Sequence, residues 1–454
     1  MPNTLEENVN RVKAAKANIG EAIIAKGGTV NRGDGLEDFP ADILTIPSVK
    51  NKVYGWHVDP NESDPSIAIT YLEDAVGMSP AYMDTANDVF EYGSWENAFF
   101  MPKPCMLKSD CTVDYYLDPT DYTKKADGTA SDITDPNYDG NAMMEWPKIW
   151  FKFAGGETDG DGYFYVSNVQ IDDSYHCWCN YDSEDNITDH FYTRIYNGTG
   201  TSKLRSISGI ALTSANGNGN TTVTQEVTRA TANNINSDEV EWYTSVWSDY
   251  LLITALMVLI GKSLNTQAVF GRGLDTGGQA AKESYVTGTL NNKGLFWGNT
   301  SNGASAVKIF GMENPYGCCW NRLAGCISVN RNLKIKLTYG KADGSTTVGY
   351  NQNGNGYINI GTISSQDDYL KVMAYSEYGC RPNNVTGGSS STFYADYFYQ
   401  SSGTNYALVG GGSGNGLHAG AFYLNVNDGP SSSGWSRAAS LSCKPLARKV
   451  NQRS

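Results

Sequence analysis

Residues able to act in catalysis or metal binding are sparse in this sequence. The four histidines lie far apart, and none belongs to an HExxH or similar metal-binding spacing; they are His57, His176, His190 and His418. The nine cysteines form an odd set without repeated CxxC pairs, which disfavours both a disulfide framework and a zinc cage. We therefore predict that the cysteines are mainly buried thiols.

Acidic pairs and glycine-rich turns do not specify a catalytic site either. Asp172 and Asp173 could serve glycoside hydrolysis only if the fold brought two carboxylates face to face. The sequence has no GxSxG elbow, and "FGRGLDTGG" lacks a following ribose-binding carboxylate. Asp159 and Asp161 stand in a turn without the other ligands of a calcium loop. The sequence therefore leaves calcium binding open and specifies no site for it. We predict a protein that is not an enzyme, with no cofactor and no metal ligand specified.

Composition and charge narrow the class of partner. The net charge of -14 and the lack of any basic run disfavour nucleic acid and anionic membrane surfaces. The one long apolar run, residues 250–260, is too short to span a bilayer and predicts a buried helix instead. The amino terminus lacks the hydrophobic core of a signal peptide, so we expect synthesis in a cytoplasm. Aromatic residues make up 12% of the chain, which suits a binding surface.

Three regions are expected along the chain. Residues 1–47 form a helical segment, because apolar residues from Leu5 to Ile23 recur at helical spacing. Lys16 interrupts a strict heptad, which leaves open a helix packed on its own domain and a short self-associating coil. Residues 48–140 form a small β-rich intermediate region, and residues 141–454 form the large domain.

The large domain should be an α+β fold with many loops. Residues 143–171 contain two β-rich runs joined by a Gly/Asp turn, which predicts a hairpin. Ser237 and Asp238 are helix-start residues before the apolar run, so the main buried helix is expected to begin there. After residue 263, short β-like segments alternate with Gly, Asn and Ser, which indicates a loop-dominated surface.

One motif carries a family resemblance. "GMENPYGCCWNRLAGCI", residues 311–327, resembles the GxENxxGNVWEWxDG signature of the C-type lectin fold in formylglycine-generating enzymes and in proteins diversified by retroelements. Glu313, Asn314 and Trp320 keep the pattern, whereas Cys318 and Cys319 depart from it. Segments on both sides, over about residues 140–450, look like phage-encoded variable proteins of gut bacteria.

The last part of the chain resembles the region that diversity-generating retroelements rewrite. In that family, template adenines are randomised, mostly at AAC codons. Changes in the first two bases of such a codon never yield Lys, Glu, Gln, Met or Trp. Residues 401–442 contain no Lys, Glu, Gln or Met, and the one Trp, Trp435, falls where the family keeps a fixed Trp. A Gly/Ser-rich loop would also be poor in these residues, so plain loop composition remains the alternative reading.

The resemblance implies two interleaved sets of residues within this variable region. We predict that the changeable positions form the ligand face, with Tyr423, His418 and Arg437 as energetic anchors. This set is Gly412, Ser413, Gly414, Asn415, Leu417, His418, Tyr423, Asn425, Asn427, Asp428, Ser433, Gly434, Ser436 and Arg437. The fixed scaffold set is Gly410, Gly411, Gly416, Ala419, Gly420, Phe422 and Trp435 in this region, together with Trp320 and Asn314 of the motif at residues 311–327.

The resemblance implies a phage receptor-binding protein of the tail-fibre type. A variable lectin-like face would bind a host cell-surface protein or glycan, and the amino-terminal segment would attach to other virion proteins. We expect a virion location on tail or capsid and a homo-oligomer, with a trimer favoured. One alternative is a formylglycine-generating oxidoreductase, which would need a catalytic cysteine pair where only Cys380 and Cys443 stand. The other is a fixed bacterial surface adhesin.

Overall fold

The chain divides into two compact units at the junction of Lys52 and Val53. The computed structural model describes residues 5–25, 30, 35, 38–39, 51–343 and 345–447. In the first unit, helix α1 (Leu5–Ala25) confirms the expected amino-terminal helix. Most of the remaining residues between 26 and 47, the rest of the predicted helical segment, lie outside the described part of the structure.

The second unit is a mixed α and β structure with few helices, many strands and long loops. A four-stranded sheet has the order β2-β1-β9-β8, formed by Ile69–Glu73, Val53–Val58, Gly162–Ser167 and Trp150–Gly155. A six-stranded sheet has the order β11-β24-β10-β7-β5-β6, formed by Trp242–Thr244, Leu441–Cys443, His190–Arg194, Gly140–Pro147, Lys103–Lys108 and Val113–Tyr116.

The largest sheet carries the carboxy-terminal third of the chain. Its order is β16-β15-β14-β21-β22-β20-β17, formed by Ile358–Thr362, Asn332–Ile335, Trp320–Val329, Thr404–Val409, Leu424–Val426, Tyr397–Gln400 and Asp368–Tyr369. Strand β23 (Arg437–Ala438) pairs in parallel with β14 outside this path. Three two-stranded ribbons complete the strands: β3 (Tyr82–Asp84) with β4 (Val89–Glu91), β12 (Lys308–Ile309) with β13 (Met312–Glu313), and β18 (Val372–Ser376) with β19 (Gly379–Asn384).

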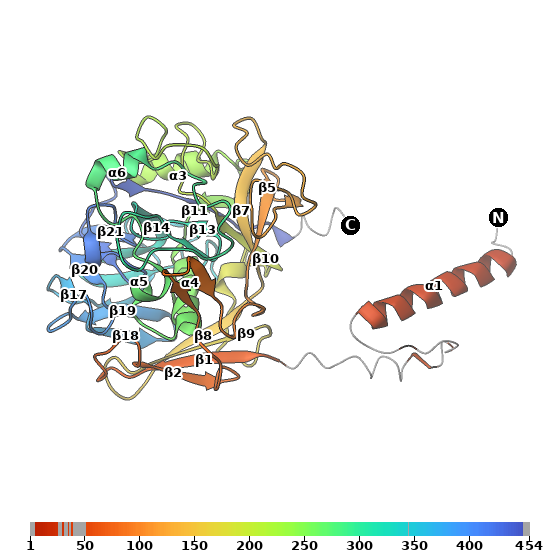
Figure 1. The fold of residues 1–454 in the computed structure, drawn as a ribbon, viewed down its shortest axis with the longest axis horizontal. Coiled ribbons are helices and arrows are strands. Elements are labelled where there is room, and N and C mark those ends of the chain that lie inside the picture. Colours follow the sequence, from red (N-terminus) through yellow and green to blue (C-terminus); the bar gives the residue numbers. More distant parts are fainter. Residues whose placement is uncertain are drawn as a thin grey trace. The chain divides into compact units, whose positions relative to one another are not determined.

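Helix α4 (Trp247–Gly261) lies in the middle of this unit, with the sheets around it (Figure 1). Nearly every one of its residues is buried, because most of its side chains are apolar and other elements pack around it. Neighbouring strands hydrogen-bond its backbone: Trp56 Nε1 donates to the Ala255 carbonyl at 3.0 Å, and the Tyr71 hydroxyl donates to the Leu259 carbonyl at 2.8 Å. The buried helix predicted for the apolar run is therefore confirmed.

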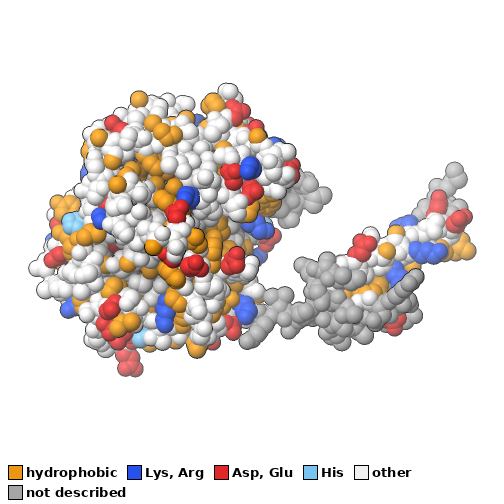
Figure 2. All heavy atoms as spheres, viewed as in Figure 1, with side chains coloured by type: hydrophobic (Ala, Val, Ile, Leu, Met, Phe, Trp, Pro, Cys, Tyr) orange, Lys and Arg blue, Asp and Glu red, His pale blue; other side chains and the backbone are white. Residues whose placement is uncertain are grey.

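The other helices are short and lie at loop positions. They are α3 (Val223–Thr231), α5 (Thr266–Phe270), α6 (Gly278–Ser284), η1 (Trp178–Asn180) and η2 (Gly416–His418). The Thr222 side chain caps α3 by accepting from the Gln225 amide, and the Gln225 side chain accepts from the Thr222 amide in return. No helix in the described ranges is long and apolar enough to cross a membrane. Hydrophobic, acidic and basic side chains are interspersed on the face drawn in Figure 2.

Two details of the predicted organisation are corrected by strand pairing. The expected hairpin is confirmed as β8 and β9, but α4 begins at Trp247 instead of near Ser237, because residues 242–244 pair with β24 as strand β11. Residues 53–140 are rich in strands, yet they do not form a region apart from 141–454. Strand β1 pairs with β9 and β5 pairs with β7, so both strands are integral to sheets of the large unit.

Candidate ligand-binding face

The motif at residues 311–327 and the predicted variable region lie side by side in the fold. Strand β14 begins within the motif and lies between β21, which precedes the variable loop, and β23, which ends it. Trp320 is paired in register with Arg437, and the Trp320 amide donates to the Ser436 carbonyl at 2.8 Å. The two sequence segments that carry the resemblance therefore form one structural region.

The loop between β21 and β22, residues 410–423, is closed by backbone contacts at both ends. The Gly410 amide donates to the Tyr423 carbonyl at 3.0 Å, and the Gly317 amide donates to the Gly410 carbonyl at 3.1 Å. Gly411 has a φ of +78°, and a Cβ there would stand 2.9 Å from the Tyr423 ring. Glycine is needed at this position for both its backbone conformation and its lack of a side chain.

A buried carboxylate anchors the second half of the same loop. Asp396 is fully buried, and its Oδ2 accepts from the Phe422 amide at 2.6 Å. Burial raises the pKa of Asp396 well above its usual range, and the hydrogen bond from Phe422 opposes this rise. A Cβ on Gly420 would overlap the Asp396 carboxylate, so this carboxylate fixes both Gly420 and Phe422.

The predicted scaffold residues are mostly interior. Asn314, Trp320, Ala419 and Phe422 are buried, as are the backbones of Gly410, Gly411 and Gly420. Asn314 has a φ of +47° and its Oδ1 accepts from the Val307 amide at 3.3 Å. Gly416 and Trp435 are half-buried.

Four predicted ligand-face residues are buried and cannot contact a ligand from these positions: Gly412, Ser413, Tyr423 and Asn425. Ser413 is fully buried because its hydroxyl donates to the Gly278 carbonyl at 2.7 Å and its amide donates to the Cys318 carbonyl at 3.1 Å. Tyr423 packs edge-on against Trp320, with ring centroids 4.4 Å apart. Asn425 lies in β22, where its Oδ1 accepts from the Asn427 amide at 2.8 Å.

The other ten predicted positions reach the surface. Gly414, Leu417 and Ser433 are exposed, and Leu417 is 45% exposed. The remaining seven are half-buried: Asn415, His418, Asn427, Asp428, Gly434, Ser436 and Arg437. The accessible part of the predicted face therefore consists of the tip of the 410–423 loop and the 427–437 loop.

Aromatic rings surround His418 and form what we call the aromatic cluster, made of Tyr369, Tyr397, His418 and Tyr423. His418 stacks on Tyr397 with ring centroids 4.3 Å apart, and Tyr369 meets His418 edge-on at 5.2 Å. Burial lowers the pKa of His418, and the nearby Asp368 carboxylate opposes this shift. Tyr369, Tyr397 and His418 are half-buried, whereas Tyr423 is buried and only supports the other rings. Accessible rings beside a polar imidazole suit recognition of a ligand with apolar and polar parts.

Sequence reasoning missed Tyr369 and Tyr397, although one signal was present. In "DYFYQ", Tyr397 and Tyr399 alternate with Phe398, so the two tyrosines share one face of strand β20 while Phe398 is fully buried on the other. Tyr399 is 40% exposed beside the aromatic cluster. Tyr369 comes from β17, which pairs with β20, and this pairing was not evident from the sequence.

The 427–437 loop is held mainly through its backbone and one ion pair. Arg437 donates from Nε and Nη2 to the two carboxylate oxygens of Asp428, at 2.9 and 2.7 Å. The Asn220 amide donates to the Gly434 carbonyl at 2.8 Å, and the Val223 amide donates to the Pro430 carbonyl at 3.1 Å. Main-chain contacts of this kind place the loop without depending on the side chains of the residues between them.

Nine free cysteines are described, and seven of them are buried, in line with the predicted thiols. Cys443 lies against Cys111, with their Sγ atoms 3.2 Å apart, while Cys380 lies on the separate ribbon of β18 and β19. The structure therefore does not bring Cys380 and Cys443 together as a pair.

A different pair, Cys318 and Cys319, lies directly beneath the 410–423 loop. The hydrogen bond from Cys318, with Lys282 and Arg194 nearby, lowers the pKa of Cys319 to about 7 against the opposing effect of burial. Asn197 Nδ2 also donates to Cys319 Sγ at 3.4 Å. The sequence shows that the two cysteines are adjacent. It does not show that Lys282 and Arg194 lie near them.

Comparison with known proteins found a weak structural similarity. No family model matches the chain, and no curated protein matches it. Among solved structures, the chain is similar to a "Major Tropism Determinant U1 Variant", with 12% identity, a TM-score of 0.23, and coverage of 76% of this chain and 72% of that one. A similarity of this size does not establish a common fold.

Proposed function

We propose that this protein is a phage receptor-binding protein that displays a diversified ligand-binding face on a C-type lectin-like fold. The observation that carries the proposal is the construction of the 410–423 loop. Its two ends are fixed by backbone hydrogen bonds and by buried Phe422, while Leu417 and the half-buried His418 stand at its tip. Such a loop can change its tip side chains at little cost in stability.

The composition of the tip supports a role in adhesion. Leu417 offers exposed apolar area, and the aromatic cluster beside it supplies rigid rings that lose little entropy on binding. The ligand we propose is a host cell-surface protein or glycan. A small face of this kind binds weakly in one copy, so several copies on one particle would supply avidity.

The amino-terminal unit supports the part of the proposal that concerns assembly. Helix α1 exposes Leu5, Val9, Val12 and Ile19 to solvent in the described single chain. Apolar side chains in a row along a helix gain stability when another helix covers them. We propose that α1 joins copies of this chain, with a trimer favoured, and attaches them to other proteins of the virion.

Binding of the purified full-length protein to cells of the host bacterium tests the adhesive role. Leu417→Asp should reduce cell binding at least tenfold, because it places a charge at the centre of the exposed face. Ile67→Asp is the matched control, since Ile67 is an equally apolar side chain, 64% exposed, on a different part of the unit. Equal binding by both variants and the unchanged protein would contradict the proposed face.

A further inference from the structure

A cleft of about 350 Å³ opens between helix α3 and the loop at residues 350–352. Three tyrosines line it, Tyr243, Tyr350 and Tyr406, together with Thr224 and Thr228 from α3 and Gln352 from the loop. Its volume lies at the lower end of the range of small-molecule sites, about 300–1,000 Å³. The cleft is large enough for a ligand of one or two rings.

The tyrosine hydroxyls in this cleft are available to a ligand. No hydrogen bond joins the hydroxyl of Tyr243, Tyr350 or Tyr406 to any part of the chain that the structure describes. Tyr406 as a whole is only 3% exposed, but none of the three hydroxyls is among the fully enclosed polar atoms that lack a partner, so each hydroxyl reaches the open part of the cleft. A polar ligand in the cleft can therefore form hydrogen bonds with them.

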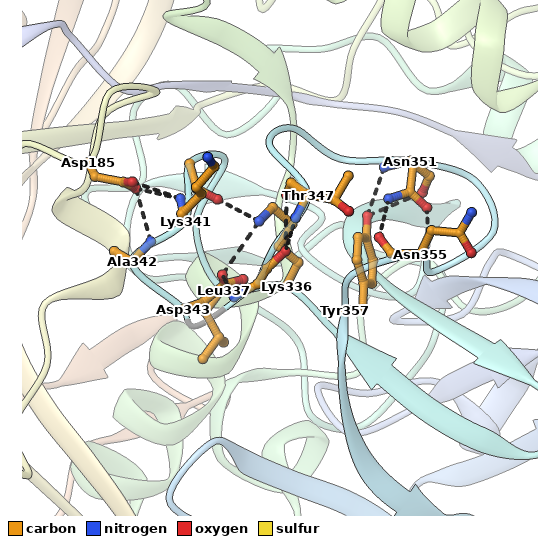
Figure 3. A network of polar contacts seen from close by, with 12 residues as sticks. Asp185, Lys336, Leu337, Lys341, Ala342, Asp343, Thr347, Asn351, Asn355 and Tyr357 are labelled. Atoms are coloured by element: carbon orange, nitrogen blue, oxygen red, sulfur yellow. Dashed lines mark hydrogen bonds and ion pairs between the residues drawn. The ribbon is translucent and has the colours of Figure 1, made fainter.

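The wall formed by residues 350–357 is held by hydrogen bonds within its own loop, as Figure 3 shows. The Tyr357 hydroxyl accepts from the Asn351 amide at 2.9 Å and donates to the Asn351 carbonyl at 3.2 Å. Asn351 Oδ1 accepts from the Asn355 amide at 3.1 Å, and Asn351 Nδ2 donates to the Asn355 carbonyl at 2.8 Å. Gln352 Nε2 then donates to Thr224 Oγ1 at 2.9 Å and joins this wall to α3.

The chain just before this wall, residues 337–343, is held by two carboxylates, Asp185 from an earlier segment and Asp343 from the same loop. Asp185 accepts from the Lys341 and Ala342 amides at 2.8 and 3.1 Å, and Asp343 accepts from the Leu337 amide at 2.9 Å (Figure 3). A wall fixed in this way loses little conformational entropy when a ligand enters. Preorganisation of this kind favours binding.

The lining determines which chemical class of ligand fits. Hydroxyl and amide groups stand beside aromatic rings, and the described lining contains no charged side chain. Arg322 and Glu226, which act electrostatically on Tyr406, lie in the interior with both side chains nearly fully buried, and each charge has its partner at 3.4 Å. An ionic ligand would find no counter-charge here, whereas a ring with several hydroxyls would find both hydrogen-bonding groups and an aromatic surface.

We infer that this cleft binds an uncharged saccharide unit. The site is distinct from the aromatic cluster and goes beyond the proposed receptor-binding face, so it does not require that face to vary or to bind. It adjoins the 427–437 loop, because the Tyr406 amide donates to the Asp428 carbonyl at 2.8 Å and the Val223 amide donates to the Pro430 carbonyl. A saccharide held here would therefore lie next to that loop.

Ligand-observed NMR and calorimetry on the full chain test the inference with defined probes. The neutral probes are the methyl glycosides of glucose, mannose and galactose, with N-acetylglucosamine, and the charged comparators are glucuronate and glucose 6-phosphate. We expect at least one neutral probe to bind with a Kd on the order of 1 mM, and to bind more tightly than the charged comparators. No binding by any neutral probe, or equal binding by the charged ones, would overturn the inference.

Two variants locate the binding within the protein. Tyr406→Phe removes one hydroxyl and keeps the ring, so it should preserve the fold and weaken saccharide binding about tenfold. Thr228→Trp fills the cleft from an exposed position on α3 and should abolish binding. Tyr82→Phe is the matched control, because Tyr82 is exposed on β3 and does not line the cleft. Unchanged binding in both cleft variants would place the saccharide elsewhere and refute the assignment.

Discussion

Arg437 and Asp428 form a two-point ion pair across the loop that joins β22 to β23. Two guanidinium nitrogens donate to two carboxylate oxygens, and the side chains are 25% and 13% exposed, respectively. Paired hydrogen bonds of this geometry fix orientation as well as distance. Both residues belong to the predicted ligand face, yet their charges are paired with each other. In this structure Arg437 therefore stabilises the loop, and it is not a free contact for a ligand.

A double-mutant cycle measures the coupling energy between Asp428 and Arg437. We expect Asp428→Asn and Arg437→Gln each to lower the free energy of unfolding, and their coupling energy to be about 1 kcal/mol, because the pair is only partly exposed. Chemical denaturation of the two single variants and the double variant provides the measurement. A coupling energy near zero would mean that the loop is held by its backbone contacts alone.

The glycines of the 410–423 loop should differ sharply in tolerance to a methyl group. Gly420→Ala should destabilise the protein by about 1–3 kcal/mol, because the new Cβ would overlap the Asp396 carboxylate. Gly414→Ala is the matched control, since the nearest atom to its Cβ would be Gly278 Cα at 3.9 Å, and its effect should stay within about 0.5 kcal/mol. Thermal unfolding of both variants tests the difference, and similar effects would contradict the close packing at Gly420.

His418 should make stability depend on pH in one direction. Its pKa is lowered from its ordinary value of 6.5 because burial disfavours the charged ring. His418 therefore binds a proton more readily in the unfolded chain than in the folded one. The contribution of the neutral ring to the free energy of unfolding is complete above pH 6.5 and is lost as the pH falls below it.

Comparison with His418→Phe, which keeps an aromatic ring and does not titrate, isolates this effect. The variant should gain stability relative to the unchanged protein as the pH falls, as measured by denaturation on both sides of pH 6.5. An NMR titration of the His418 ring gives its pKa directly. A raised pKa, or a stability difference that does not change with pH, would contradict the prediction.

Elements with a strong local pattern were predictable from the sequence. The apolar run at residues 250–260 is buried as α4, and the two β-rich runs around the Gly/Asp turn form β8 and β9. The start of α4 was not predictable, because the polar residues after Ser237 look like a helix start while residues 242–244 gain more by pairing with β24. That partner lies about 200 residues later in the chain, and no local pattern reveals it.

The candidate site also has a part that could be predicted from the sequence and a part that could not. The alternation of small fixed residues with variable neighbours gave the frame of the loop, since it depends on local backbone geometry. Burial of Ser413 and Tyr423 could not be foreseen, because it depends on Gly278 and Trp320, which come from distant segments. Tyr369 was missed for the same reason, as it reaches His418 only through the pairing of β17 with β20.

Helix α1 provides a test of assembly that is independent of the binding face. Val12→Asp should shift the full chain toward a monomer in sedimentation measurements, because it puts a charge among the exposed apolar side chains. Asn10→Asp is the control, since it adds the same charge at an exposed position on another side of the helix. A monomeric unchanged protein, or a loss of assembly in both variants, would contradict self-association through this face.

Natural variation at residues 401–442 should follow burial as well as the genetic pattern. If a retroelement rewrites this region, substitutions should concentrate at accessible positions such as Gly414, Leu417, His418 and Ser433. Ser413 should vary little or only to small residues, because its side chain is fully buried and its hydroxyl donates to the Gly278 carbonyl.

If phages carry this gene, as proposed, sequencing this part of it in many phages from one source, beside any near-identical template repeat, measures the distribution. Asp428 and Arg437 should change together more often than apart, since a lone partner would leave a half-buried charge without its counter-charge. Substitutions matched to template adenines would support the diversified face. A uniform sequence would favour a fixed adhesin, and frequent large side chains at Ser413 would mean that this loop can adopt a backbone different from the one described.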